Sequence, residues 1–150
     1  MVAVSEPTNP NGNMGIGAAI LDEKGNSVWE YSFAVMKGEH GFNQTSNNVA
    51  EYLAMIKLLG YFKAKEISVK DATFYADSQL VINQMLGNWN MNGGIYVKYA
   101  HMAFSLRDEL EKRDNCKIKF EWISRVHNNR ADELSKTCLK EKGVKFRIQP

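Results

Sequence analysis

The segment from Thr73 to Ile82 constrains the fold most strongly, because an acidic residue joins a strand pattern to a helix pattern there. Residues 73–76 are β-branched, aromatic or small and apolar, as in a buried strand. Asp77 follows, and Ser78 can cap a helix that runs from Gln79 to Leu86. Open α/β sheets build their sites at the carboxyl ends of strands. Since a charge is costly there without a partner, Asp77 indicates a site to which other polar residues contribute.

The rest of the chain supplies further strand and helix patterns in a definite order. Three early strands, joined by tight turns, predict an antiparallel meander. Helices are expected after Asn48 and after Gly94, a last strand follows, and Asn128 or Asn129 can cap a final helix. The expected strands are 1–5, 15–21, 28–35, 73–76 and 117–123, and the expected helices are 49–64, 79–86, 95–113 and a last one that includes 131–135. We therefore expect an α/β fold with a mixed five-stranded sheet flanked by helices.

Composition is that of an ordinary soluble protein. The chain has 150 residues, 44% of them hydrophobic and 24% charged, which suits one domain over residues 1–150. The net charge of +2 does not by itself indicate a nucleic-acid partner, although basic residues dominate positions 125–147 and are typical of a phosphate-facing or solvated surface. No stretch is long enough to span a membrane, and the start lacks signal-peptide features. We expect a cytoplasmic monomer with no membrane partner.

Three carboxylates occupy related places in this scheme. Glu51 is expected in the first turn of a helix, Asp77 at a strand end, and Asp132 in the first turn of the final helix. Each alone would be interpreted as a carboxylate that complements a helix dipole or caps a helix. Gathered together they would repel, and a divalent cation would remove that penalty. Oxygen ligands favour Mg²⁺ or Mn²⁺ over zinc, and two such ions about 4 Å apart can promote phosphodiester cleavage.

Four segments in order resemble the motifs of type 1 ribonuclease H. They are Asn9-Pro10-Asn11-Gly12 with the strand that starts at Gly15, residues 46–51, residues 76–82, and residues 125–134. The resemblance covers nearly the whole chain and implies a ribonuclease H-like fold. It also implies hydrolysis of the RNA strand of an RNA/DNA hybrid with two Mg²⁺ ions, for which Mn²⁺ can substitute. Glu51, Asp77 and Asp132 would bind the metal.

The resemblance also assigns residues to the substrate. It places Asn9, Asn47 and Gln79 at the hybrid, the last two in the minor groove, where the ribose 2′-hydroxyl distinguishes RNA from DNA. His127 would assist proton transfer and product release. Helix capping by Asn47, a solvated Gln79 and a surface His127 are the structural alternatives.

The first strand departs from the family pattern. The family has its first metal-binding Asp at the end of this strand, and no Asp lies between Met1 and Pro10. One alignment puts Val2 at that position and leaves almost no strand; the other puts Ser5 there, with Glu6 beside it. We favour the second, because a central strand needs several residues to pair. Ser5 or Glu6 is then the fourth metal-binding candidate. A catalytically weakened or inactive nucleic-acid-binding domain is the alternative function, and a DNA-strand-transfer or Holliday-junction nuclease on the same fold is a third.

Overall fold

A computed structural model describes residues 2–8, 14–35, 47–90, 94 and 96–124. The elements are β1 (Val2–Thr8), β2 (Met14–Leu21), β3 (Ser27–Val35), α1 (Asn47–Ala64), β4 (Thr73–Ala76), α2 (Gln79–Met85), α3 (Val97–Asp114) and β5 (Lys119–Trp122). This order matches the predicted one, with β4 correct to the residue. The final helix, predicted after Asn128 or Asn129, lies outside the described residues.

The five strands form one mixed sheet in the order β3-β2-β1-β4-β5. β1 pairs with β2, and β2 with β3, in antiparallel fashion, which confirms the predicted meander. β4 pairs in parallel with β1 on one side and β5 on the other. β1 is therefore the central strand, and the carboxyl ends of β1, β4 and β5 point the same way.

The first strand is longer than predicted. The sequence predicted a strand that ends at Ser5, but β1 continues to Thr8, which pairs with Gly15 of β2. The hairpin partner explains the difference, because β2 offers eight residues with which β1 can form a ladder. The predicted strand ended too early because Pro7 is typical of a turn. Proline is confined to particular strand positions, but it does not exclude a strand.

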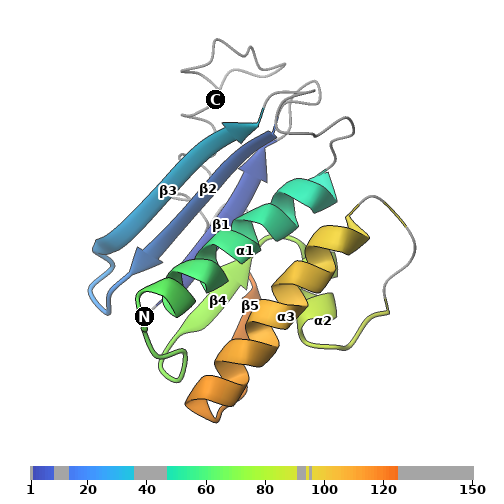
Figure 1. Ribbon diagram of the computed structural model, residues 1–150. Coiled ribbons are helices and arrows are strands. Elements are labelled where there is room, and N and C mark those ends of the chain that lie inside the picture. Colours follow the sequence, from blue (N-terminus) through green and yellow to red (C-terminus); the bar gives the residue numbers. More distant parts are fainter. Residues whose placement is uncertain (1, 9–13, 36–46, 91–93, 95, 125–150) are drawn as a thin grey trace.

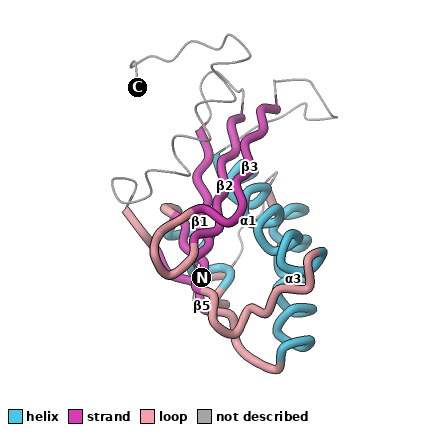
Figure 2. Tube along the Cα trace, turned by 90° about the vertical axis from the view of Figure 1, so that its left-hand side faces the viewer, coloured by secondary structure: helices cyan, strands magenta, loops and turns pink. Residues whose placement is uncertain are grey.

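Two long helices cover one face of the sheet. Figures 1 and 2 show α1 and α3 on the same side, with α1 running antiparallel to β1 and β4. The buried side of α1 is broad. It includes Tyr52, Met55, Leu59 and Phe62, all fully buried. Burial against both a sheet and a neighbouring helix requires an apolar surface broader than one stripe.

Aromatic rings hold β4 in place. The Phe74 ring lies 5.0 Å from that of Phe62 in α1 and 5.6 Å from that of Phe120 in β5, measured between centroids. All three side chains belong to the main core cluster. Because such rings bury large apolar areas, the strand that leads to Asp77 is fixed from both sides.

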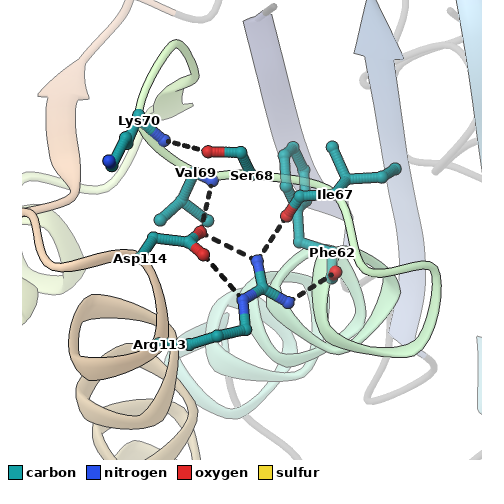
Figure 3. Close-up of polar contacts among 7 residues, drawn as sticks. All are labelled: Phe62, Ile67, Ser68, Val69, Lys70, Arg113 and Asp114. Atoms are coloured by element: carbon teal, nitrogen blue, oxygen red, sulfur yellow. Dashed lines mark hydrogen bonds and ion pairs between the residues drawn. The ribbon is translucent and has the colours of Figure 1, made fainter.

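Arg113 and Asp114, at the end of α3, fasten this helix to the segment that follows α1 (Figure 3). Two guanidinium nitrogens donate to the Asp114 carboxylate, each at 2.8 Å. Arg113 also donates to the carbonyls of Phe62 and Ile67, and the Val69 amide donates to Asp114 at 2.8 Å. The hydrogen bonds from Arg113 and then from Val69 lower the pKa of Asp114 from 3.8 to about 2.

We expect Asp114→Asn to reduce the free energy of unfolding by about 1.5–3 kcal/mol at neutral pH, since hydrogen bonds to a charged group are lost. Because the pKa is lowered on folding, the contribution is complete above pH 3.8 and disappears as the pH falls toward 2. Urea unfolding from pH 7 down to pH 2 should therefore show the two proteins converging in acid.

Asp108→Asn is the matched control. Asp108 also pairs with the preceding arginine, at 2.9 Å, but its side chain is 66% exposed. Exposed pairs contribute little, so this variant should stay within about 0.5 kcal/mol of the parent protein. A constant difference between Asp114→Asn and the parent at every pH would contradict the assignment.

Candidate functional site

Asp77 follows the last residue of β4 and is held there by its backbone. Ser78 is the N-cap of α2, and its side chain accepts a hydrogen bond from the Val81 amide at 3.2 Å, as predicted. The indole nitrogen of Trp122 donates to the Asp77 carbonyl at 3.0 Å. The Ile123 amide donates to the Ala76 carbonyl, also at 3.0 Å, and extends the ladder with β5. These contacts fix the main chain on both sides of the partly buried Asp77 side chain.

Glu51 is buried in α1, with only 6% of its surface exposed. The sequence placed it in the first helical turn, but α1 begins at Asn47, so Glu51 is the fifth residue and the first turn has no acidic residue. The helix-dipole effect falls off within the first turn. Complementing the dipole is therefore a weak reason for a carboxylate here, and burying one is costly.

The two carboxylates come from elements that share one core. Ala50 and Tyr52, which flank Glu51, belong to the same buried cluster as Ala76, which precedes Asp77. Figure 1 shows that the first turns of α1 lie toward the ends at which β1 and β4 finish. The fold thus brings the segments that carry Glu51 and Asp77 to one end of the sheet.

The register of β1 separates the two candidates for the fourth ligand. Ser5 pairs with Ala18 of β2 and Ala76 of β4, and both of these alanines are fully buried in the core. Glu6 is the next residue along β1, just as Asp77 is the next residue after Ala76. Consecutive strand residues lie on opposite faces. Glu6 and Asp77 therefore occupy corresponding positions, because each follows a member of the pair formed by Ser5 and Ala76. Glu6 pairs with Gly17 of β2.

The remaining predicted residues divide into two groups. Gln79 is exposed at the first position of α2, with its carbonyl accepting a hydrogen bond from the Asn83 side chain at 2.8 Å. Asn47 is the first helical residue of α1 rather than the residue that precedes the helix. Asn9, His127 and Asp132 lie outside the described residues.

The described carboxylates suit a hard divalent cation in their chemistry. Glu51 Oε2 and Asp77 Oδ1 are buried and receive no hydrogen bond within the described part of the chain, although both residues interact with neighbours. Carboxylate oxygens are the ligands that Mg²⁺ and Mn²⁺ prefer. Among the side chains that the structure describes, which exclude those of residues 2–8 and 125–150, no three His, Cys, Asp or Glu residues form a metal-binding group. A complete site would therefore need Glu6 or Asp132.

Two features of this region were missed by sequence reasoning. Gln84 of α2 is buried and contacts Tyr52 of α1, the residue that follows Glu51. Trp122 was predicted only as a strand residue, but its indole binds the Asp77 carbonyl. No periodic pattern identifies such contacts, because they join elements that are 32 and 45 residues apart.

The mixed sheet with β1 at its centre, the helices on its face and the acidic residue after β4 define a ribonuclease H-like α/β protein. The Reverse transcriptase-like family model matches residues 6–138 of the chain, and its first matched residue is Glu6. The chain therefore belongs to that family, and the predicted fold is confirmed.

Solved ribonucleases H have the same fold. LC11-RNase H1, solved in complex with an RNA/DNA hybrid, is 26% identical, with a TM-score of 0.79 over 95% of this chain and 99% of that one. The N-terminal RNase H domain of Rv2228c from Mycobacterium tuberculosis, solved as a fusion with maltose-binding protein, is 25% identical, with a TM-score of 0.73 over 91% of this chain and 98% of that one. RNase H1 from the halophilic archaeon Halobacterium salinarum is 24% identical, with a TM-score of 0.76 over 93% and 97%, and shows likeness of fold.

Curated relatives agree with the structures over part of their length. The bifunctional protein Rv2228c of M. tuberculosis is 28% identical over 114 residues, which cover 75% of this chain. The same match spans only 29% of that relative, so the chain corresponds to one part of it. In the described part of the chain, no helix has the length and apolar character required to cross a membrane.

Proposed function

We propose that this protein is a divalent-metal-dependent endonuclease that hydrolyses the RNA strand of RNA/DNA hybrids. One observation carries the proposal: a ribonuclease H-like fold brings the helix with the buried Glu51 and the segment with Asp77, which is fixed just after β4, to one end of the sheet. Membership of the family and the likeness to ribonucleases H support it. Carboxylate oxygens at these two places are the ligand type that a hard divalent cation prefers.

Glu51 and Asp77 would hold the metal, with Glu6 and Asp132 completing the ligand set. When bound, Mg²⁺ supplies an activated water and stabilises the leaving oxygen of the phosphodiester. The protein's own part is to position these carboxylates. Trp122 and Ser78 fix the main chain around Asp77, and the pairing of Ser5 with Ala76 sets β1 in register beside it.

Recognition of the hybrid is assigned to polar residues around the same strand ends. Gln79 is exposed at the start of α2, two residues after Asp77, where its amide can reach a nucleic-acid groove. Asn47 and Asn9 would contact the hybrid as well, and the 2′-hydroxyl of the RNA strand would provide discrimination. We assign His127 to proton transfer and product release.

A cleavage assay tests the proposal directly. A hybrid with a labelled RNA strand is incubated with the protein in Mg²⁺, in Mn²⁺ and in a chelator. We expect internal cuts in the RNA strand with either metal, none in the chelator, and an intact DNA strand. Duplex DNA, a four-way junction and single-stranded RNA should not be cut. Preferential cutting of the junction, or hybrid cleavage in the chelator, would contradict the proposal.

The same assay tests a second function, that of a hybrid-binding domain without useful hydrolysis. This alternative arises because β1 carries Glu6 and no aspartate. It would bind the hybrid in a filter or mobility assay and leave the RNA strand intact in both metals. Since Glu6 is a carboxylate and follows Ser5, which pairs with the residue before Asp77, we favour the nuclease.

Trp122→Phe should reduce kcat/KM for hybrid cleavage by about threefold to tenfold. The substitution keeps an aromatic ring and removes the indole N–H that binds the Asp77 carbonyl, a contribution of about 0.5–1.5 kcal/mol. Because Trp122 is 49% exposed, stability should change little. The measurement is kcat/KM at fixed Mn²⁺, with thermal unfolding alongside.

Trp89→Phe is the matched control, since Trp89 is also about half exposed, at 46%, and lies after α2. Its activity should equal that of the parent protein within about twofold. Equal activity of Trp122→Phe and Trp89→Phe would show that the indole hydrogen bond does not orient Asp77.

A further inference from the structure

Gln84 is the hub of a buried polar network. It is the sixth residue of α2 and only 3% exposed. Its side-chain oxygen accepts a hydrogen bond from the Tyr52 hydroxyl at 2.5 Å. Its amide nitrogen lies 3.3 Å from the Tyr96 hydroxyl and 3.5 Å from the Asn90 carbonyl. Both ends of the Gln84 amide are therefore satisfied inside the core.

The direction of these hydrogen bonds is fixed by the Asn90 backbone carbonyl, which can only accept. The Gln84 amide nitrogen therefore faces Asn90 and Tyr96, and its oxygen accepts from the Tyr52 hydroxyl. The two tyrosine rings are parallel within 1°, with centroids 6.0 Å apart. The stacked rings keep both hydroxyls beside the Gln84 amide.

The network joins three segments, of which one carries Glu51 and another follows Asp77. Tyr52 follows Glu51 in α1, and α2 begins two residues after Asp77. Tyr96 immediately precedes α3. A fully satisfied buried network rigidifies a core and specifies one arrangement, which apolar packing alone does less well. The hydrogen bond between Tyr52 and Gln84 is a direct polar link between the helix with Glu51 and the helix that follows Asp77.

We propose that Gln84 is a positioning residue, which holds the turn of α1 that carries Glu51 at a fixed place relative to Asp77 and thereby sets the affinity for the divalent cation. This inference rests on the proposed metal-dependent function. Gln84 does not itself contact the cation in this proposal. It acts through Tyr52, so its removal should weaken metal binding without removing a ligand.

Calorimetric titration with Mn²⁺, without nucleic acid, tests the inference. Gln84→Leu should raise the Kd for Mn²⁺ by about three- to thirtyfold, the range of substitutions that change coupling between sites. In cleavage assays the Mn²⁺ concentration for half-maximal activity should rise by a similar factor, while activity at saturating Mn²⁺ stays near that of the parent. Tyr96→Phe, which removes one hydroxyl, should shift both values in the same direction and is the milder variant if Gln84→Leu does not fold.

Two further variants separate positioning from stability. Asp114→Asn destabilises the far end of α3 and should leave the Kd for Mn²⁺ unchanged. The double variant Tyr52→Phe/Gln84→Leu replaces both hydrogen-bonding side chains by apolar ones. Its free energy of unfolding should recover relative to Gln84→Leu, whereas the raised Kd for Mn²⁺ should remain. An unchanged Kd for Mn²⁺ in Gln84→Leu would overturn the inference, and Tyr96→Phe takes its place if Gln84→Leu does not fold. A Kd that recovers together with stability in the double variant would also overturn it. Failure of the proposed function is distinguishable, since the parent protein itself would then neither bind Mn²⁺ nor cleave the hybrid.

Discussion

Asp77→Asn is expected to lower the rate of hybrid cleavage by roughly 10²–10³-fold or more, as the loss of a group that acts on the transition state does. The amide keeps the size of the carboxylate and removes its charge. Because Trp122 and Ser78 hold the main chain at this point, the fold should be retained. The measurement is the single-turnover cleavage rate at saturating protein and fixed Mg²⁺, with circular dichroism as a check of folding.

Asp71→Asn is the control for this substitution. Asp71 is an exposed aspartate just before β4, at the opposite end of the strand from Asp77. It should cleave at the rate of the parent protein. If Asp77→Asn were as active as Asp71→Asn, the proposed site would be wrong, whatever the family resemblance.

Glu6→Gln is the second substitution with a large expected effect, again roughly 10²–10³-fold on the cleavage rate. The reason is the register of the sheet. Ser5 lies in the row of the buried Ala18 and Ala76, whereas Glu6 pairs with Gly17 and corresponds in position to Asp77. Glu6 is therefore the residue of β1 that we propose as a further ligand. Single-turnover cleavage in Mg²⁺ and in Mn²⁺ measures the effect.

Ser5→Ala distinguishes the two candidates. It removes the hydroxyl of the residue that pairs with Ala18 and Ala76 and should leave the cleavage rate within a few fold of the parent. The opposite result, a strong loss in Ser5→Ala and a normal rate in Glu6→Gln, would return the ligand role to Ser5. Normal rates in both variants would mean that β1 provides no ligand.

Local sequence patterns predicted the architecture because each one is a consequence of short-range chemistry. The run from Thr73 to Ala76 could be bounded correctly, since Ser78 offers a cap immediately after Asp77. The turn at residues 22–26 could also be predicted from its own residues. Asp22 accepts hydrogen bonds from the amides of Lys24 and Asn26, and Gly25 adopts a φ of 83° that favours glycine.

The end of β1 could not be predicted from its own residues. Strand length is set by the partner, and β2 continues the ladder past Pro7 to Thr8. The same long-range pairing decides whether Ser5 or Glu6 corresponds to Asp77. Similarly, α1 starts at Asn47, two residues earlier than predicted, so Glu51 lies outside the first turn. Its carboxylate is then poorly explained as a complement to the helix dipole. These points depend on contacts between distant segments, which periodicity does not encode.

The central claim is that Glu51 and Asp77 share a divalent cation, and a crystal structure of the protein with Mn²⁺ tests it most directly. Anomalous scattering at the manganese edge locates the ion independently of the protein atoms. We predict an anomalous peak within coordination distance, about 2–2.5 Å, of carboxylate oxygens from both Glu51 and Asp77. A Mn²⁺ peak elsewhere in the protein, with both carboxylates free of metal at saturating Mn²⁺, would contradict the account.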